Sequence, residues 1–372
     1  MSSKIKICFY DSNAIQLISD SYHPSGGAAK QVLAWIKGLS LLGNTVILMG
    51  SHDNPDLYKD NNSILISYNE KKGVKILRYL YIRIPGLFIT LKKAKCDYVY
   101  YGVPGHFTGL LALITKTVRK KFILRISNDY LVDHRYMDQT DSFRKFFYSI
   151  AFRLSDYILC QNDYQLKQVS KIYPDKCFLL KNPFIGEIQK SFIPLNKRLY
   201  IAWIGIIQHQ KNIPFLYDIA SEMTEVNFKI SGNISSKLSD SELKALDLLK
   251  KLPNVELLGF INADEVIELL KSATFLLNTS HYEGFSNTFL EAFSVGTPVL
   301  TLEHNDPGGI IADKKLGFIF QNVDELKAIY SNETSLAENY SILAQNCINY
   351  MKNEHELHVQ CQQLNEILSR KE

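Results

Sequence analysis

One stretch late in the chain most strongly constrains how this sequence can fold. An apolar run, Thr274 to Leu277, predicts a buried strand, and a short polar turn follows it. Ser286 or Asn287 can then cap a helix. That helix is expected to end at Gly296, which suits a left-handed C-cap, before a new strand at Val299-Leu300. The sequence therefore predicts a strand, a glycine-containing turn, a short helix and another strand.

Two carboxylates, Glu283 and Glu291, frame the start of this predicted helix. Unpaired amides from Gly284 to Thr288 would attract an anion, and the helix dipole would add to that attraction. Glu291 shares a face with Asn287, because residues four apart are neighbours on a helix. A carboxylate beside an anion site suits hydroxyl groups better than phosphate, so the combination predicts a sugar nucleotide. The alternative is that both glutamates are solvated surface residues.

Three segments of this stretch also form a recognisable series: Glu283-Gly284-Phe285-Ser286, then Leu290-Glu291-Ala292, then Gly296-Thr297-Pro298-Val299. The series resembles the signature of retaining GT-B glycosyltransferases of family 4, the glycosyl transferases group 1. The resemblance implies that Glu291 hydrogen-bonds the donor ribose and that Glu283 contacts the donor sugar. It also implies that main-chain amides cradle the diphosphate and sugar, at Gly284, Phe285, Ser286, Asn287 and Thr288. In this family the leaving phosphate itself takes the acceptor proton, so no strong protein base is needed.

The bulk composition is that of a folded globular protein with an uneven charge. The chain has 372 residues, a length that suggests two domains, and 46% of its residues are hydrophobic. Residues 1–190 carry 27 Lys and Arg against 15 Asp and Glu, whereas residues 191–372 carry 15 against 23. No nucleic-acid recognition motif accompanies the basic half. An anionic membrane surface or a phosphorylated acceptor is therefore the better partner for that half.

Neither the cysteines nor the hydropathy point to an exported or membrane-spanning protein. The six cysteines are scattered without a C-x-x-C pair, which favours free thiols in a reducing compartment. The N-terminus lacks the apolar core of a signal peptide, and no later run reaches the ~18 apolar residues of a membrane span. We therefore expect a cytoplasmic protein.

Strands alternate with helices along the whole chain, which predicts two successive doubly wound parallel α/β sheets. The expected strands are Lys4–Tyr10, Thr45–Met49, Asp97–Tyr101, Lys121–Ile126, Tyr157–Cys160, Lys176–Leu180, Leu199–Ile204, Asn227–Ser231, Val255–Leu258, Thr274–Leu277 and Val299–Leu300. The expected helices are Lys30–Leu42, Phe107–Thr117, Pro214–Ser221, Asp264–Lys271 and the tail Ile342–Leu368, with a polar stretch between Tyr10 and Ser25.

The resemblance implies GT-B architecture, in which two Rossmann-like domains face each other across a cleft. We place an acceptor-binding domain at residues 1–190 and a nucleotide-sugar-binding domain at residues 191–350. The segment 351–372 is expected to be a helix that crosses back to the first domain.

Two further loops match the family's donor site in part. Gly26-Gly27 corresponds to a glycine-rich loop over the donor phosphates, although a Gly-Gly pair alone is usually only a turn. The family carries an arginine directly after the position of Gly205 and a lysine about five residues later, both gripping the diphosphate. Lys211 matches that lysine, but Ile206 replaces the arginine. Either another cation takes the place of the arginine, or the donor binds less tightly. The alternative for Lys211 is that it is a solvated surface lysine.

Other candidate contacts follow less directly from the sequence. His106 can fill the role of the family's loop histidine near the sugar, or it can be a polar cap of the next helix. Arg125 and Asp129 lie at a strand C-terminus and are candidate acceptor contacts, with a capped turn and salt bridge as the alternative. The segment after another strand, Gly259-Phe260-Ile261, is expected to border the nucleobase.

Two basic and aromatic stretches, Arg78 to Lys93 and Arg144 to Tyr148, suit a membrane headgroup interface. Ordinary helix packing with extended Lys and Arg side chains is the alternative. Together with the basic first half, they lead us to the hypothesis of peripheral association at the inner face of the plasma membrane.

The sequence therefore predicts a retaining glycosyltransferase that moves a hexose-type sugar from a UDP- or GDP-sugar to a glycan or polyprenyl-diphosphate-linked acceptor in surface polysaccharide biosynthesis. We expect Glu283, Lys211 and His106 to act in catalysis. No metal is expected, because the chain has no D-x-D and no H-E-x-x-H motif. The alternatives are a non-catalytic sugar-nucleotide-binding partner and a sugar-nucleotide isomerase or hydrolase on the same fold.

Overall fold

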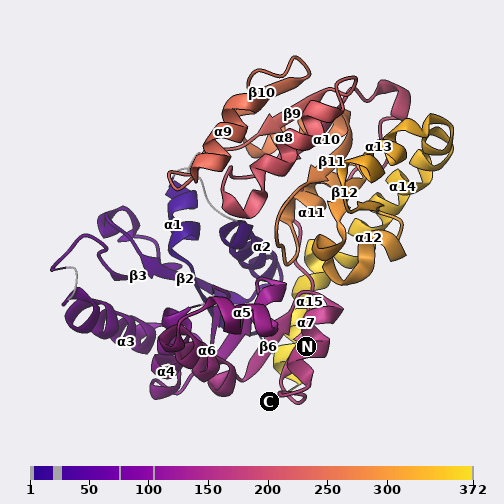
Figure 1. Cartoon of the computed structure of the whole chain (residues 1–372). Helices are drawn as coiled ribbons and strands as arrows, with labels where there is room; N and C mark the ends of the chain where they lie inside the picture. Colours follow the sequence, from indigo (N-terminus) through magenta and orange to yellow (C-terminus); the bar gives the residue numbers. More distant parts are fainter. Residues whose placement is uncertain (1–3, 20–26, 75–76, 104, 371–372) are drawn as a thin grey trace. The chain divides into compact units, whose positions relative to one another are not determined.

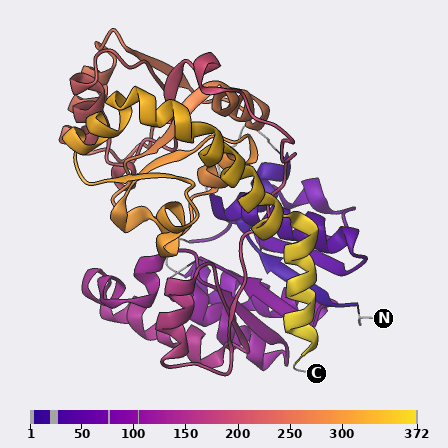
Figure 2. The same cartoon turned by 90° about the vertical axis from the view of Figure 1, so that its right-hand side faces the viewer.

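The computed structural model describes residues 4–19, 27–74, 77–103 and 105–370. These residues form two compact units (Figures 1 and 2). Unit 1 comprises residues 1–185 together with 356–372, and unit 2 comprises residues 186–355. The division falls five residues before the first boundary that we expected and five residues after the second. The roles assigned to the two domains stay predictions.

Unit 1 is built on a seven-stranded parallel sheet of order β3-β2-β1-β4-β5-β6-β7. Its strands are β1 (Lys6–Tyr10), β2 (Thr45–Ser51), β3 (Ile64–Tyr68), β4 (Tyr98–Tyr101), β5 (Lys121–Arg125), β6 (Tyr157–Cys160) and β7 (Cys177–Leu179). Its helices are α1 (Ser12–Ser19), α2 (Gly27–Leu41), α3 (Ile84–Lys93), α4 (His106–Thr117), α5 (His134–Gln139), α6 (Ser142–Leu154), α7 (Asp163–Ser170) and α15 (Leu357–Ser369), and a π-helical segment, η2 (Tyr79–Arg83), precedes α3.

The alternation of side chains along β1 divides the core of unit 1 into two layers. Cys8 and Tyr10 pack in one cluster with α3, α4 and α6, whereas Ile7 and Phe9 pack in the other. This is the two-residue period of a strand that is buried on both faces. The second cluster includes Trp35 of α2 and the apolar face of α15, so the last helix of the chain completes the core of the unit that contains the first strand.

Unit 2 is built on a six-stranded parallel sheet of order β10-β9-β8-β11-β12-β13. Its strands are β8 (Tyr200–Ile204), β9 (Phe228–Ser231), β10 (Val255–Gly259), β11 (Ala273–Asn278), β12 (Val299–Leu302) and β13 (Gly317–Phe320). Its helices are α8 (Ile213–Glu222), α9 (Asp240–Leu249), α10 (Ala263–Ser272), α11 (Asn287–Ser294), α12 (Ile310–Asp313), α13 (Val323–Ser331) and α14 (Glu333–Glu354), and the short turns η5 (His209–Lys211) and η6 (Glu303–Asn305) follow β8 and β12. The predicted pair of parallel α/β sheets is thus confirmed.

One helix was not predicted, and one expectation about local structure is wrong. The stretch after β1 is a helix, α1, because the Asp11 side chain accepts a hydrogen bond from the Ala14 amide at 2.9 Å and Ile15 is fully buried. The tail is two helices and not one, because the chain is extended at Glu356, whose side chain caps α15 by accepting from the Val359 amide at 2.9 Å.

Candidate active site

The signature stretch forms the strand, turn and helix that its sequence predicts. β11 is buried along its whole length, the turn follows, and α11 begins at Asn287. Gly296 has a φ of 68° just after α11, as expected for a left-handed helix end. The Ser286 side chain does not cap the helix; its hydroxyl lies 2.8 Å from the Thr288 hydroxyl instead. The helix start is therefore left without a capping side chain from Ser286, which suits a site that receives an anion.

Lys211 and Glu283 form the central ion pair of this region. The Lys211 Nζ lies 2.5 Å from Oε1 of Glu283, and the side chains are only 14% and 11% exposed. The Ser280 hydroxyl donates to the same carboxylate oxygen at 2.8 Å. Both side chains were predicted to bind the donor, and the structure brings them together. The pair carries no net charge, because the carboxylate cancels the ammonium.

Hydrogen bonds join the loop after β8 to the loop after β11. The Thr279 hydroxyl donates to the Lys211 carbonyl at 2.7 Å, and the Trp203 indole donates to that hydroxyl at 3.1 Å. The His281 amide donates to the Gln210 carbonyl at 2.8 Å. Since β8 and β11 are neighbours in a parallel sheet, both loops leave the same carboxyl edge, where α/β sheets bind ligands.

Gly205 leaves room for the Lys211 side chain. A Cβ at Gly205 would lie 3.1 Å from the Lys211 Cε, closer than ordinary packing permits. The carbonyl of Gly205 lies against Gly232, whose φ of 155° a side chain would rarely adopt. The two glycines let the loops after β8 and β9 approach each other closely.

The remaining predicted donor residues of unit 2 occupy the same carboxyl edge. Glu291 lies one turn inside α11 and is half-buried. Gly259 ends β10 with a φ of 66°, and its carbonyl accepts from the Gly232 amide at 2.8 Å and from the Ser231 hydroxyl at 2.9 Å. Phe260 is 40% exposed and Ile261 is half-buried, so both have surface available to a ligand.

In unit 1 the two candidate acceptor contacts are engaged in the protein itself. Arg125 is buried and donates to the Leu180 carbonyl and to the Asn182 side chain, both at 2.6 Å. Burial lowers the pKa of its guanidinium. The Asp129 carboxylate accepts from Asn162 at 2.9 Å and from Gln165 at 2.7 Å, and burial raises its pKa. These contacts hold the ends of β5, β6 and β7 together, and they give the acceptor role no support.

His106 is the first residue of α4, and its ring lies near two aromatic side chains. The ring centroids of Tyr79 and Phe143 are 6.0 Å and 6.1 Å from it. Gly27 is the exposed first residue of α2, while Gly26 lies outside the described residues. The predicted roles of these residues beside the donor stay predictions.

Comparison with known proteins agrees with this geometry. Residues 185–354 match the family model for glycosyl transferases group 1. Unit 2 is a glycosyl transferases group 1 domain. An uncharacterized glycosyltransferase of Methanocaldococcus jannaschii, MJ1178, is 26% identical to the chain over 187 residues. These residues are 49% of this chain and 51% of that relative, so the match spans about half the length of each protein.

Solved structures share the fold over the whole chain. Alr3699/HepE of Anabaena, in complex with UDP, aligns with a TM-score of 0.76 at 14% identity and covers 98% of this chain and 100% of that one. Sucrose-phosphate synthase of Thermosynechococcus elongatus aligns with a TM-score of 0.76 at 13% identity and covers 99% of each chain. At such identities the likeness shows the fold, which is the GT-B fold of two Rossmann-like domains.

The group 1 domain also contains a side-chain cluster that we did not predict. It consists of His209, His281, His304 and Glu242, which come from four separate segments around the Lys211–Glu283 pair. The sequence offered one signal: His209 lies two residues before Lys211, and His281 lies two residues before Glu283. The contact between them depends on the pairing of loops, which a single sequence does not reveal.

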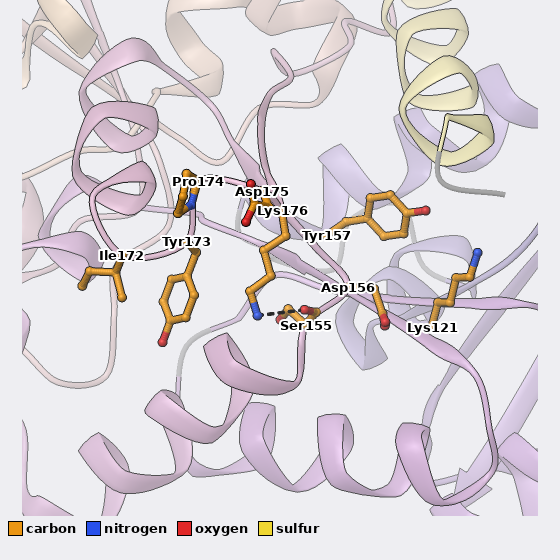
Figure 3. Close-up of a pocket in the computed structure, with 9 residues that line it drawn as sticks. All are labelled: Lys121, Ser155, Asp156, Tyr157, Ile172, Tyr173, Pro174, Asp175 and Lys176. Carbon is orange, nitrogen blue, oxygen red and sulfur yellow. Dashed lines mark hydrogen bonds between the residues drawn. The ribbon is translucent and has the colours of Figure 1, made fainter.

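Unit 1 contains a separate hollow of about 450 Å³ (Figure 3). It lies where β5, β6 and β7 begin, at the opposite edge of the sheet from the one where parallel sheets bind ligands. Lys176 reaches across it and donates to the Ser155 carbonyl at 3.0 Å. None of the predicted site residues is among its lining residues, which are Lys121, Ser155, Asp156, Tyr157, Ile172, Tyr173, Pro174, Asp175 and Lys176.

Proposed function

We propose that this protein is a retaining, metal-independent glycosyltransferase that moves a hexose-type sugar from a UDP- or GDP-sugar to a glycan or lipid-linked acceptor in surface polysaccharide biosynthesis. The observation that carries the proposal is the Lys211–Glu283 pair at the carboxyl edge of the unit 2 sheet. It lies beside the turn that opens α11, and main-chain amides at a helix start attract anions. A cation, a carboxylate and amides together suit a diphosphate joined to sugar hydroxyls.

Each residue of this group has a distinct task in the proposed reaction. Lys211 and the amides from Gly284 to Thr288 stabilise the charge that develops on the departing nucleoside diphosphate. Glu283 positions the sugar through its hydroxyls, and Glu291 accepts from the donor ribose. The departing phosphate takes the acceptor proton, so the reaction needs no separate strong base on the protein.

Binding of a panel of UDP- and GDP-sugars, measured by calorimetry, tests the donor assignment. Glu291→Ala should weaken binding of the preferred donor by about 1–3 kcal/mol, because a charged hydrogen-bond acceptor is lost. Glu225→Ala is the matched control, since this exposed glutamate lies between α8 and β9. Failure of every sugar nucleotide to bind, or an unaffected Glu291→Ala variant, would remove the donor site from the proposal.

Turnover assays separate the proposal from its alternatives. A transferase consumes its donor appreciably only when an acceptor is present, whereas a hydrolase or isomerase consumes it alone. A non-catalytic partner binds the donor and turns over nothing with any acceptor. The anomeric configuration of the product, read by NMR, tests retention, and activity after treatment with EDTA tests metal independence.

We also propose that unit 1 attaches peripherally to an anionic membrane. Large apolar side chains on η2 and α6 are exposed: Leu80 at 61%, Tyr81 at 74%, Phe143 at 60% and Phe146 at 61%. η2 contacts α3, α3 contacts α4, and α4 contacts α6. Residues 71–128 contain 13 Lys and Arg and a single acidic residue, Asp97. Apolar groups beside a cationic surface match acyl chains below anionic headgroups.

Co-flotation with vesicles tests this attachment. At low salt the wild type should float with vesicles containing phosphatidylglycerol and not with pure phosphatidylcholine. The variant Phe143→Ser/Phe146→Ser should float several-fold less. Leu199→Ser/Ile234→Ser, at two similarly exposed positions of unit 2, is the control and should float as the wild type does. Absence of flotation at low salt would contradict the proposal. Within the described residues, no helix is both long and apolar enough to cross a bilayer.

A further inference from the structure

Three histidines follow three neighbouring strands of the unit 2 sheet. His209 follows β8, His281 follows β11 and His304 follows β12, and these strands are adjacent in the order β8-β11-β12. Because all three strands are parallel, the histidines extend from one edge of the sheet. That edge is the one that carries the Lys211–Glu283 pair.

Contacts within this cluster fix where protons can lie. The His209 Nδ1 is 2.9 Å from Oε1 of Glu242. A carboxylate only accepts hydrogen bonds, so Nδ1 carries the hydrogen and a second proton must add at Nε2. The His304 Nε2 is 3.2 Å from the Ser280 carbonyl and carries the hydrogen for the same reason. The rings of His209 and His281 lie with their centroids 5.2 Å apart.

Glu242 is a buried anion that accepts a hydrogen bond from the His209 ring. Its side chain is only 4% exposed. Burial alone would raise its pKa, but hydrogen bonds from Ser239 and His209 outweigh burial and lower that pKa below its usual value. The carboxylate is therefore ionised at neutral pH and holds the imidazole ring in place.

His281 lies in an environment that disfavours its charge in the free protein. Burial lowers its pKa, and the nearby His209 and His304 lower it further, while Glu242 opposes them. The other charged groups nearby are Lys211 and Glu283, which neutralise each other. A negative group placed beside the His209–His281 pair would reverse this balance and favour protonation.

The ion pair at the proposed donor site supplies no net positive charge for a diphosphate. The Lys211–Glu283 pair is neutral, and Ile206 stands where the family resemblance places an arginine. His209 lies two residues before Lys211, and His281 lies two residues before Glu283. The hydrogen bond from the His281 amide to the Gln210 carbonyl joins the two loops that contain them.

We propose that His209 and His281 provide the cationic contacts that replace the missing arginine, and that donor binding is accompanied by proton uptake at this pair. The inference rests on the proposed function, because its ligand is the diphosphate of the donor. Proton uptake makes donor affinity depend on pH. Affinity therefore falls as pH rises through the range in which donor binding takes up the proton.

Calorimetry in two buffers of different ionisation enthalpy measures the proton uptake. The probe is UDP-glucose, or whichever member of the sugar-nucleotide panel binds most tightly, because a nucleotide sugar has no phosphate group that titrates near neutral pH. The wild type should take up a substantial fraction of one proton at pH 7, and its affinity should fall several-fold between pH 6 and pH 8. His209→Gln/His281→Gln should bind about tenfold more weakly with no proton uptake. His358→Gln, an exposed histidine on α15, should behave as the wild type.

The outcomes separate this inference from the function on which it rests. Donor binding without proton uptake by the wild type would overturn the histidine proposal and leave the glycosyltransferase proposal standing. Retention of affinity and proton uptake by the double glutamine variant would also overturn it. If no sugar nucleotide binds the wild type, both proposals fail. Thermal unfolding of the variants checks that they are folded; a small decrease in the transition temperature is expected, because Glu242 loses the hydrogen bond from the His209 ring.

Discussion

Lys211 and Glu283 are 72 residues apart in the chain, yet the ammonium of the first lies 2.5 Å from the carboxylate of the second. The parallel pairing of β8 with β11 brings them together, because each residue lies in the loop that follows one of these strands. In the donor complex that we propose, the ammonium exchanges the carboxylate for a phosphate, and the carboxylate is then available to sugar hydroxyls.

We predict that Lys211→Met weakens donor binding by about 1.5–3 kcal/mol, the usual range for hydrogen bonds to charged groups. Because Glu283 loses its cation in this variant, Lys211→Met and Glu283→Gln should not be additive. The double variant should show a coupling free energy of about 0.5–3 kcal/mol in a double-mutant cycle measured by calorimetry. Lys244→Met, at an exposed position on α9, is the control. Full additivity would mean that the two side chains act independently.

Arg198 is predicted to be essential for the stability of unit 2. Its buried guanidinium donates to the carbonyls of Ile193, Ala273 and Gly296 and to the Thr297 hydroxyl, at distances from 2.5 Å to 3.1 Å. Arg198→Met would leave these acceptors unpaired and should lower the free energy of unfolding by about 2–4 kcal/mol. Urea denaturation measures the loss. Arg→Met at the exposed Arg370 should change little, and an unaffected Arg198→Met would contradict this role.

Glu242→Gln should destabilise unit 2 in a pH-dependent way. The folded state lowers the pKa of Glu242 below its ordinary value of 4.5, so its ionised form stabilises the fold at pH values above that value. The stabilisation is lost as pH falls through the lower pKa of the folded state. The difference between the wild type and Glu242→Gln should therefore be about 1 kcal/mol at pH 7 and should shrink below pH 4.5. Urea titrations at several pH values test this; a difference that grows toward acid would show that the sign is wrong.

Gly38 allows α15 to pack closely on α2. A Cβ at this position would collide with the Cys361 Sγ and would lie 2.9 Å from the Leu357 Cδ1. Gly38→Val should therefore destabilise unit 1 by about 1–3 kcal/mol through overpacking. Adding Cys361→Ala should recover part of the loss, because it removes one of the two colliding groups. Thermal unfolding of the single and double variants measures both effects, and equal transitions for wild type and Gly38→Val would contradict the close approach.

The alternation of strands and helices was predictable because most buried strands are apolar runs between turns. β6, from Tyr157 to Cys160, has the bounds that the sequence predicts. β3 (Ile64–Tyr68) and β13 (Gly317–Phe320) were missed, since each lies at an edge of its sheet and is only partly buried. α1 was missed because it buries only two residues, Ala14 and Ile15, and the polar residues around them mask the helical pattern of apolar positions.

The positions of site residues could be predicted only where one continuous segment of the chain contains them. The turn that leads into α11 is such a segment, so the positions of Glu283 and Glu291 could be placed from the sequence. The histidine cluster draws on separate loops and on α9, and its distances are set by strand order. Arg125 shows a different limit of sequence-based prediction. Its position at a strand end suggests that it contacts a ligand, but its hydrogen bonds are made to Leu180 and Asn182 of the protein itself.

The return of α15 to unit 1 has a consequence for the order in which the protein is made. Leu364 and Leu368 pack in the same cluster as Trp35 and Phe9, yet the ribosome adds them after every residue of unit 2. Unit 2 is continuous in the chain and can fold as it emerges. The sheet of unit 1, although synthesised first, must keep an apolar groove uncovered until translation has passed residue 368. Of the two units, unit 1 is therefore synthesised first but completes its core last.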